Sequence, residues 1–378
     1  LNLDYQNLSP YYRVYPSRTD FKQPYGMFSG AAQYRYTPDE RTVFKLYAGY
    51  DRTSFSNYAD ADRHLFGLGE NNVYLNTTFR KRAASGWNWF FGAAYSFYDR
   101  RVGGAVTGGD AWSERQQELH LKVRSFRQFT PWLRLDAGVE TFIRSYRDYY
   151  RFELLYDENR MYPTICAGFL SSIFYLSEHF KTELSFRPEY VSLNRRMNWS
   201  PRAAVSYAWN RLSISVVAGQ YTQLPENKYL IKNTALPSNI CRQTLFSLQY
   251  EQSGRFYKAE FYYKNYKRLE LSVPQGMVPD GYGYSKGIDL YFCDNALWKN
   301  FEYRLSYSYN LSKRKYREYT ELTVPQYATR HNVSLVLKYS VPRLRTIFSV
   351  TDRLASGRPY HNPELPGLMN DEVKPYHY

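Results

Sequence analysis

The segment FEYRLSYSYNL, residues 301 to 311, alternates apolar and polar side chains along its whole length. Phe301, Leu305 and Tyr309 fall on one face of an extended chain, and Glu302 and Arg304 fall on the other. A period of two residues predicts a β-strand with one apolar face and one polar face. The same pattern suits a soluble sandwich and a strand that faces lipid, so this segment alone does not identify the solvent on its apolar side.

The alternation recurs on both sides of a regular series of short turns. These turns lie near residues 39, 85, 131, 178, 210, 254, 297 and 342. The spacing between successive turns is about 45 residues in most cases, which fits a repeating unit of one two-stranded hairpin and one longer connection. A strand on either side of each turn predicts about 16 strands in all.

The connections between these hairpins are much longer than the turns within them. They are polar, run for roughly 12 to 20 residues, and lie within the segments 51–72, 99–117, 220–243, 266–287 and 309–330. A sandwich has connections of similar length at both ends, and a propeller places about four strands in a repeat of this length. Outer-membrane barrels combine short turns with long loops. The pattern therefore predicts an all-β, transmembrane, antiparallel up-and-down β-barrel with lipid against its apolar faces.

Composition agrees with a barrel. The 378 residues include 41 Tyr, 23 Phe and 7 Trp, and tyrosine suits strands that cross a boundary between lipid and water. The mean hydropathy of −0.63 and the absence of long apolar runs exclude a helical membrane protein. The net charge of +15 is spread along the chain and can reflect anionic lipopolysaccharide outside, an anionic ligand inside, or neither. No nucleic-acid motif accompanies this charge, so nucleic acid is not an expected partner.

The two ends of the sequence do not continue the pattern. Residues 1 to 26 and 353 to 378 each contain several prolines and predict irregular structure without a closing strand. A barrel must pair its first and last strands, so the expectation is a part of a larger barrel. A complete, passive, porin-like channel of about 16 strands is the alternative.

From about residue 200 onward, the sequence resembles the barrel of the TonB-dependent outer-membrane receptors in the form common in Bacteroidetes. The segments that carry the resemblance are SPRAAVSYAWNRLSISVVAGQYTQLPENKYL (200–230), GYGYSKGIDLYF (281–292), FEYRLSYSYNLSKRKYREY (301–319), QYATRHNVSLVLKYSV (326–341) and ASGRPYHNP (355–363). NLSPYYRVYP near the start is also similar to this family. The resemblance implies a barrel of about 22 strands, of which residues 1–378 are a part that lacks the plug domain and the last strands.

The resemblance also implies a function. The family imports scarce solutes, such as siderophores, haem, vitamins, peptides or glycans, across the bacterial cell outer membrane. The expected partners are outer-membrane lipid and lipopolysaccharide, the solute, with an anionic one favoured by the charge, and the TonB complex, which acts through the plug. No cofactor is implied. The six histidines are scattered and no catalytic or metal motif stands out, so an enzyme is not expected.

Candidate ligand-binding residues are aromatic and charged groups in the long connections and on the upper polar faces of strands, where a solute can be held in a partly dehydrated cleft. They are Glu226, Asn227, Tyr229, Tyr282, Tyr284, Arg330, Arg358, Tyr360 and Asn362. Structural roles remain open for all of them. Arg330 can pair with a neighbouring carboxylate, and the tyrosines can belong to an aromatic girdle.

Overall fold

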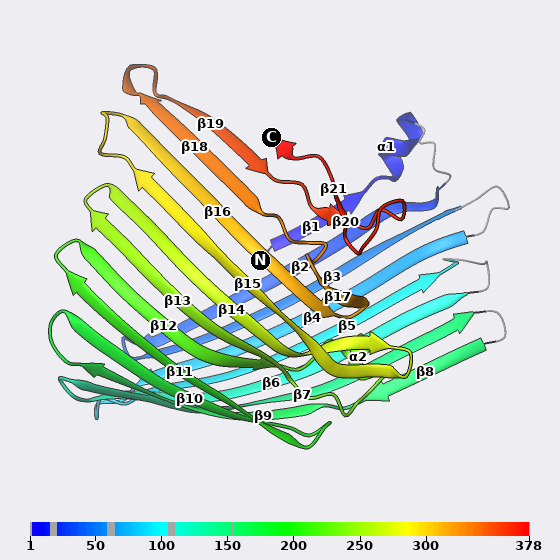
Figure 1. Cartoon of the computed structure of the whole chain (residues 1–378), viewed down its shortest axis with the longest axis horizontal. Helices are drawn as coiled ribbons and strands as arrows, with labels where there is room; N and C mark the ends of the chain where they lie inside the picture. Colours follow the sequence, from blue (N-terminus) through cyan, green and yellow to red (C-terminus); the bar gives the residue numbers. More distant parts are fainter. Residues whose placement is uncertain (1, 16–20, 59–64, 105–109, 153–154, 378) are drawn as a thin grey trace. The chain divides into compact units, whose positions relative to one another are not determined.

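The computed structural model describes residues 2–15, 21–58, 65–104, 110–152 and 155–377. It is built almost entirely of antiparallel strands (Figure 1). The chain divides into two compact units. The first unit comprises Leu1–Gln128, Leu135–Leu170 and Pro188–Met197, and the second comprises Phe129–Arg134, Ser171–Arg187 and Asn198–Tyr378.

The first unit contains the N-terminal strands and one short helix. Its elements are β1 (Asn2–Asn7), α1 (Ser9–Val14), β2 (Phe21–Asp39), β3 (Thr42–Tyr58), β4 (Leu65–Arg82), β5 (Asn88–Gly103), β6 (Ala111–Thr130), β7 (Leu133–Phe152) and β8 (Leu155–Met161). Strands β1 to β6 pair in chain order, and β8 pairs with β7. The residues of β9 (Thr164–Tyr175) and β10 (Phe180–Val191) are shared between the two units.

The second unit contains the remaining strands. Its elements are β11 (Arg196–Trp209), β12 (Leu212–Gln223), α2 (Asn227–Leu230), β13 (Asn239–Gln252), β14 (Arg255–Val273), β15 (Gly276–Asp294), β16 (Phe301–Tyr316), β17 (Tyr319–Thr323), β18 (His331–Val341), η1 (Pro342–Leu344), β19 (Thr346–Ala355), β20 (Pro359–Tyr360), β21 (Asp371–Glu372) and β22 (Tyr376–His377). Strands β11 to β16 pair in chain order, β18 pairs with β16 and β19, and β17 folds back on β16.

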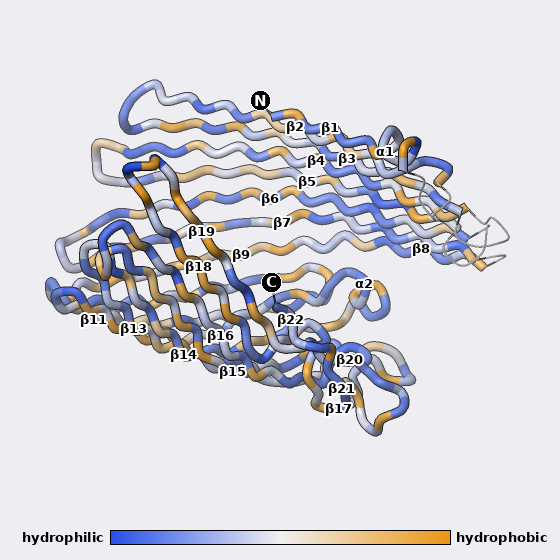
Figure 2. The backbone as a smooth tube through the Cα atoms, turned by 90° about the horizontal axis from the view of Figure 1, so that it is seen from above, coloured by the Kyte–Doolittle hydropathy of each residue, from blue (hydrophilic) through white to orange (hydrophobic). Residues whose placement is uncertain are grey.

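The predicted strand pattern is confirmed. Each of the eight predicted turns joins two strands, and the strands that flank them are β2 to β7, β9 to β16, β18 and β19, which are 16 strands. Figure 2 shows the alternation of hydrophilic and hydrophobic residues along them. None of the described helices has the length and apolar character that a membrane-spanning helix requires.

The prediction of irregular ends was wrong for much of residues 1–26. Most of the described residues of 353–378 are irregular as predicted, and the strands there are only the end of β19 and the two-residue strands β20, β21 and β22. Residues 2–7 form β1, which pairs with β2, and β22 pairs with the end of β19. The prolines do not prevent this. Pro10 lies in the first turn of α1, where its missing N–H is not needed, and Pro24 lies at an irregularity of β2 between Gln23 and Gly26. Pro16 lies outside the described residues.

The long connections are also shorter than predicted, because many strands continue into them. Residues 266–287 form the distal halves of β14 and β15, and the two strands are joined by a tight turn at 274–275. β6 and β7 have 20 residues each, whereas a strand crosses a bilayer in about 9 to 11. The strands therefore extend well beyond the thickness of a bilayer. Residues 224–238 remain a true connection that contains only α2.

The apolar faces of the second unit are exposed. One row of side chains in register across β12 to β16 consists of Val216, Phe246, Phe261, Ile288 and Tyr309. The rings of Phe246 and Phe261 lie 6.0 Å apart, and these two side chains are 38% and 44% exposed. Cross-strand apolar pairs of this kind stabilise the sheet, but they do not remove the apolar surface from the solvent.

The adjacent row on the other face is polar. It consists of Ser215, Ser247, Glu260, Asp289 and Ser308, and Ser247 is only 8% exposed. Exposed phenylalanine beside buried serine is the reverse of what a water-soluble protein shows. Lipid in contact with the apolar face explains this reversed exposure, because the exposed phenylalanines then face hydrocarbon and not water.

The first unit repeats the same arrangement. Phe44, Phe79, Phe91 and Val123 form an apolar row across β3 to β6, and the rings of Phe79 and Phe91 lie 6.2 Å apart. The other face carries ion pairs, such as Lys122 Nζ to Glu140 Oε2 at 3.1 Å. Each unit thus has two sides of opposite character, which we call its apolar face and its polar face.

Candidate functional site

The connection between β12 and β13 has a small hydrophobic core of its own. Leu230 and Leu236 are completely or almost completely buried, as is Tyr229. Other buried apolar residues lie in the distal part of the β14–β15 hairpin and around the end of β16, namely Leu269, Leu271, Met277, Tyr316 and Ala328. Asn233 Nδ2 donates a hydrogen bond of 2.8 Å to the carbonyl oxygen of Met277, which ties the connection to the hairpin. This connection is therefore a folded element rather than a free loop.

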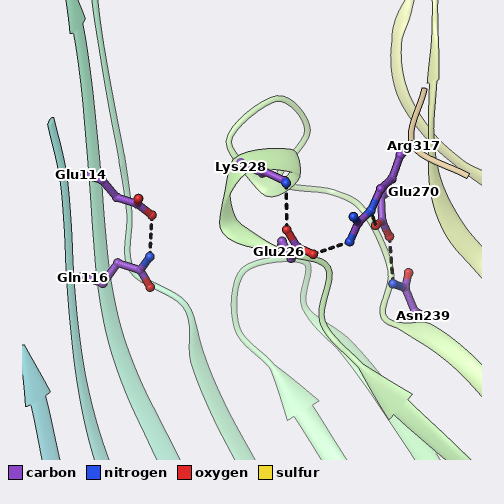
Figure 3. Close-up of polar contacts among 7 residues, drawn as sticks. All are labelled: Glu114, Gln116, Glu226, Lys228, Asn239, Glu270 and Arg317. Carbon is purple, nitrogen blue, oxygen red and sulfur yellow. Dashed lines mark hydrogen bonds and ion pairs between the residues drawn. The ribbon is translucent and has the colours of Figure 1, made fainter. Parts of the chain in front are cut away.

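Beside this core, Arg317 joins two carboxylates (Figure 3). Its guanidinium pairs with Glu226, and its Nε lies 3.3 Å from Oε1 of Glu270. Glu270 is only 4% exposed, and its other oxygen accepts a hydrogen bond of 2.9 Å from Asn239. Lys228 Nζ lies 3.1 Å from the second oxygen of Glu226. A buried carboxylate is tolerated only with such partners, so Arg317 holds the network together.

Backbone geometry places Arg317 at this point. It lies in the short turn between β16 and β17 and adopts a left-handed conformation, with φ 56°. Its N–H donates to the carbonyl oxygen of Glu270 at 2.5 Å, and its carbonyl oxygen accepts from the N–H of Ser272 at 2.7 Å. The turn is therefore bonded to the end of β14.

A series of alternating tyrosine rings and cationic side chains leads from the polar face of β14 and β16 to the Arg317 network. Arg314 lies 4.2 Å from the ring centroid of Tyr266 and 5.6 Å from that of Tyr316. Arg317 lies 5.0 Å from the ring of Tyr316 and 5.4 Å from that of Tyr229, and Lys228 lies 4.9 Å from the Tyr229 ring. We call the six residues Tyr266, Arg314, Tyr316, Arg317, Tyr229 and Lys228 the tyrosine–cation ladder. Each contact has the geometry of a cation–π interaction.

Two features of the ladder affect how it can bind a ligand. Burial raises the pKa of the Tyr229 phenol, against the opposing charges of Arg317 and Lys228, so the hydroxyl stays protonated at neutral pH. Within the described part of the chain, Nε of Arg314 is buried without a hydrogen-bond partner, and so is Nε of Arg202, which stacks 4.3 Å from the ring of Tyr221 on the same face. Buried donors of this kind are costly unless a ligand or water accepts from them.

Glycines of β15 allow residues two strands apart to meet. Gly283 stands between Tyr266 on β14 and Arg314 on β16, in register with both. A Cβ atom at Gly283 would lie 2.4 Å from the carbonyl oxygen of Lys313, so no side chain fits there. Gly287 has the same place between Tyr262 and Asn310, and the Tyr262 hydroxyl donates to Oδ1 of Asn310 at 3.2 Å.

The predicted ligand-binding residues fall into separate groups. Glu226 and Tyr229 belong to the Arg317 network and the ladder, and Asn227 begins α2 between them. Tyr282 and Tyr284 share the apolar face with Ile288, because they differ from it by an even number of positions along β15. Tyr282 is 51% exposed there. The structure therefore separates these two tyrosines from the ladder.

The remaining predicted residues lie near the C-terminal end. Arg330 is exposed, and its backbone N–H donates to Oγ of Ser356 at 2.8 Å. The Tyr360 hydroxyl and the Asn362 amide donate to one carboxylate oxygen of Asp371, at 2.5 Å and 3.1 Å. Tyr360 belongs to the small β20–β21 hairpin, as does Asp371, and exposed Arg358 precedes it. These contacts fold the hairpin on itself. Its connection also reaches β17, where Thr323, the register partner of Arg314, donates through Oγ1 to the carbonyl oxygen of Leu368 at 2.9 Å.

Sequence reasoning missed Tyr266, Arg314, Tyr316, Arg317 and Glu270. The alternation of faces along a strand could have identified Tyr266 and Arg314. Tyr266 is an even number of positions from Glu260 on β14, and Arg314 is an even number from Ser308 on β16, so both share the polar face with those residues. The contact between them depends on Gly283, and the pairing of strands that creates it is not visible in local sequence. All three cysteines are free, and no group of three or more His, Cys, Asp or Glu side chains among the described residues could hold a metal ion.

Comparison with solved structures identifies the fold. The chain is similar to the copper transporter OprC, with a TM-score of 0.74 and 13% identity over 94% of this chain and 63% of OprC. It is also similar to a mutant of the ferric enterobactin receptor PfeA from Pseudomonas aeruginosa, with a TM-score of 0.74 and 11% identity over 96% of this chain and 62% of the receptor. The outer membrane transporter YddB from Escherichia coli gives a TM-score of 0.71 and 11% identity over 89% of this chain and 57% of YddB.

These similarities show that the chain has the fold of outer-membrane transporter barrels, as the alternation predicted. It spans only about three fifths of the length of these proteins. No protein-family model and no curated protein sequence matches the chain.

Replacing Arg317 with methionine is expected to loosen the connection between β12 and β13. The change keeps the length of the side chain but leaves Glu270 buried without its cation, which costs about 1–3 kcal/mol. Hydrogen exchange at the amide of Ile231, which bonds to the carbonyl oxygen of Asn227, is expected to accelerate accordingly. Lys228→Met is the control, because this more exposed side chain forms a surface ion pair with Glu226 that is worth less than about 0.5 kcal/mol. Equal protection in both variants would show that Arg317 does not hold the connection.

Proposed function

We propose that this chain is the barrel part of a TonB-dependent outer-membrane receptor that imports a scarce solute. The observation that carries the proposal is the tyrosine–cation ladder on the polar face of a fold shared with transporters and receptors for copper and ferric enterobactin. The exposed apolar faces support a place in the bacterial outer membrane, against lipid and lipopolysaccharide. The resemblance in sequence adds the plug through which TonB acts and the strands that complete a barrel of about 22.

The ladder suits an anionic or aromatic solute. A planar guanidinium stacked on tyrosine keeps N–H donors for a carboxylate, phosphate or similar oxygen, and the tyrosine rings offer apolar contact. The chain's own residues would bind and orient the solute and would perform no covalent step, so we infer a transporter and not an enzyme.

The predicted residues then have different roles. Glu226 orients Arg317, and Tyr229 supplies a ring to the ladder, with Asn227 adjacent. Arg330, Arg358, Tyr360 and Asn362 are proposed as further solute contacts. Tyr282 and Tyr284 lie on the apolar face, and we propose a girdle role for them in place of ligand binding.

Uptake that depends on TonB is the test. Cells that carry the full-length gene would be supplied with labelled copper, ferric siderophores or haem, one at a time, with the TonB gene intact or deleted. Uptake of at least one solute is expected in the intact cells and is expected to stop in the deletion. Uptake that continues without TonB would replace the receptor proposal with the passive porin.

A further inference from the structure

A hollow opens on the apolar face of the first unit. Its floor is made of small residues that lie in register on four neighbouring strands, namely Ser56 on β3, Gly67 on β4, Gly103 on β5 and Ala111 on β6. Its volume is about 720 Å³, which lies within the range of small-molecule sites. Crowding does not require a glycine at position 67 of this floor, because a Cβ atom there would contact only the Cβ of Ser56, at 3.7 Å.

Three arginines line this hollow. Arg101 and Arg115 come from β5 and β6, and Arg147 comes from β7. We call the hollow with these three residues the arginine basin. Asp99, whose side chain is 7% exposed, accepts from Nε of Arg101 and from Nε of Arg115, both at 3.0 Å. A single buried carboxylate thus orients two guanidinium groups, and each keeps further N–H donors for a ligand.

The charge of the basin is not balanced within it. Arg101 is 69% exposed, and it shares the Asp99 carboxylate with Arg115. Arg147 pairs with Glu158 at 2.5 Å, and Glu158 is also shared, with Arg160 at 2.7 Å. The lining of the basin therefore contains three cations and one anion, and it favours an anionic ligand.

The basin begins where the apolar surface ends. Along β5 the apolar face carries Phe91, Tyr95 and Phe97 and then changes to Asp99 and Arg101. The eight steps from Trp89 to Phe97 cover about 26 Å of strand at about 3.3 Å per residue, close to the height of the apolar band of a membrane barrel. The Arg115 guanidinium lies 5.8 Å from the ring centroid of Phe97, so charge and apolar surface are in contact.

We propose that the arginine basin binds the phosphate group of an outer-leaflet glycolipid, with the lipid chains along the apolar surface below. A molecule that carries a phosphate next to hydrocarbon matches both parts of this surface, whereas a soluble anion would use only the arginines. Phosphate accepts bidentate hydrogen bonds from guanidinium, which suits the oriented Arg101 and Arg115. This inference rests on the outer-membrane location in the proposed function, but not on TonB, so each can fail without the other.

The test compares two lipids on the full-length protein, purified in a non-ionic detergent. Native mass spectrometry would measure the binding of lipid A with its phosphates and of dephosphorylated lipid A. Wild-type protein is expected to prefer the phosphorylated lipid by about tenfold, or about 1.4 kcal/mol. The triple variant R101S, R115S and R147S is expected to lose this preference. Gly67→Leu, which fills the floor but keeps the arginines, is expected to weaken binding of the phosphorylated lipid.

A matched control removes the same charge elsewhere. The triple variant R211S, K299S and R343S changes three residues at or beside short turns and is expected to keep the lipid preference. Inorganic phosphate in excess is not expected to displace the lipid. The proposal is overturned if the R101S, R115S and R147S variant prefers phosphorylated lipid A as the wild type does, or if inorganic phosphate displaces the lipid completely.

Discussion

Ile288→Arg is expected to lower the free energy of unfolding in a bilayer by about 2–4 kcal/mol and to reduce the amount of protein in the outer membrane. Ile288 lies on the apolar face of β15, in register with Phe261 and Tyr309 on the neighbouring strands. An arginine there would place a charge in hydrocarbon without a partner. Urea titration in lipid vesicles would measure the loss.

Ser308→Arg is the control at the same level of the sheet. Ser308 lies on the polar face of β16, in register with Asp289 and Asn332, so a new arginine has water and a carboxylate nearby. Its unfolding free energy is expected to stay within about 1 kcal/mol of wild type. Equal losses in the two variants would mean that the two faces of the sheet meet the same environment.

Arg314→Ala is expected to reduce uptake at low solute concentration by about 10- to 30-fold, or about 1.4–2 kcal/mol. Arg314 is the first cation of the ladder, with its guanidinium 4.2 Å from the ring centroid of Tyr266. Uptake would be measured with the solute identified in the TonB experiment. Arg314→Lys keeps the charge but not the planar stacking on Tyr266, so it is expected to recover only part of the loss.

Arg304→Ala separates ligand binding from damage to the strand. Arg304 lies on the same face of β16 as Arg314, but it pairs with Glu302 near the opposite end of the strand, with Nε 2.6 Å from Oε1. This variant is expected to take up solute within twofold of wild type. A comparable loss in Arg304→Ala and Arg314→Ala would remove the ladder from the binding site.

Much of the fold was predictable because it depends on local features of the sequence, namely the two-residue period of the strands and the positions of the short turns. The period of two in β13 and β14 fixes which side chains share a face, and short turns such as 253–254 fix where the chain reverses. The inverted exposure of Phe246 and Ser247 follows from the same period once lipid is the outer solvent. No long-range information was needed for these features.

The loops and the site depended on contacts between distant segments. The polar, turn-rich composition of 266–287 suggested a loop, but pairing between β14 and β15 continues through it with bulges near Arg268. The aromatic side chains of Tyr282 and Tyr284 suggest ligand binding, but their even positions along β15 place them on the apolar face with Ile288. Arg317 and Glu226 are 91 positions apart, and only the folded connection between β12 and β13 brings them together.

Single-cysteine scanning of β13 tests most directly whether lipid covers the apolar faces. In a background with the three natural cysteines replaced by serine, a nitroxide label would be placed in turn at Phe246, Ser247, Leu248 and Gln249 in the outer membrane. Labels at 246 and 248 are expected to collide with oxygen dissolved in lipid, and labels at 247 and 249 with a water-soluble nickel complex. Four labels with the same accessibility, or the opposite alternation, would contradict the account.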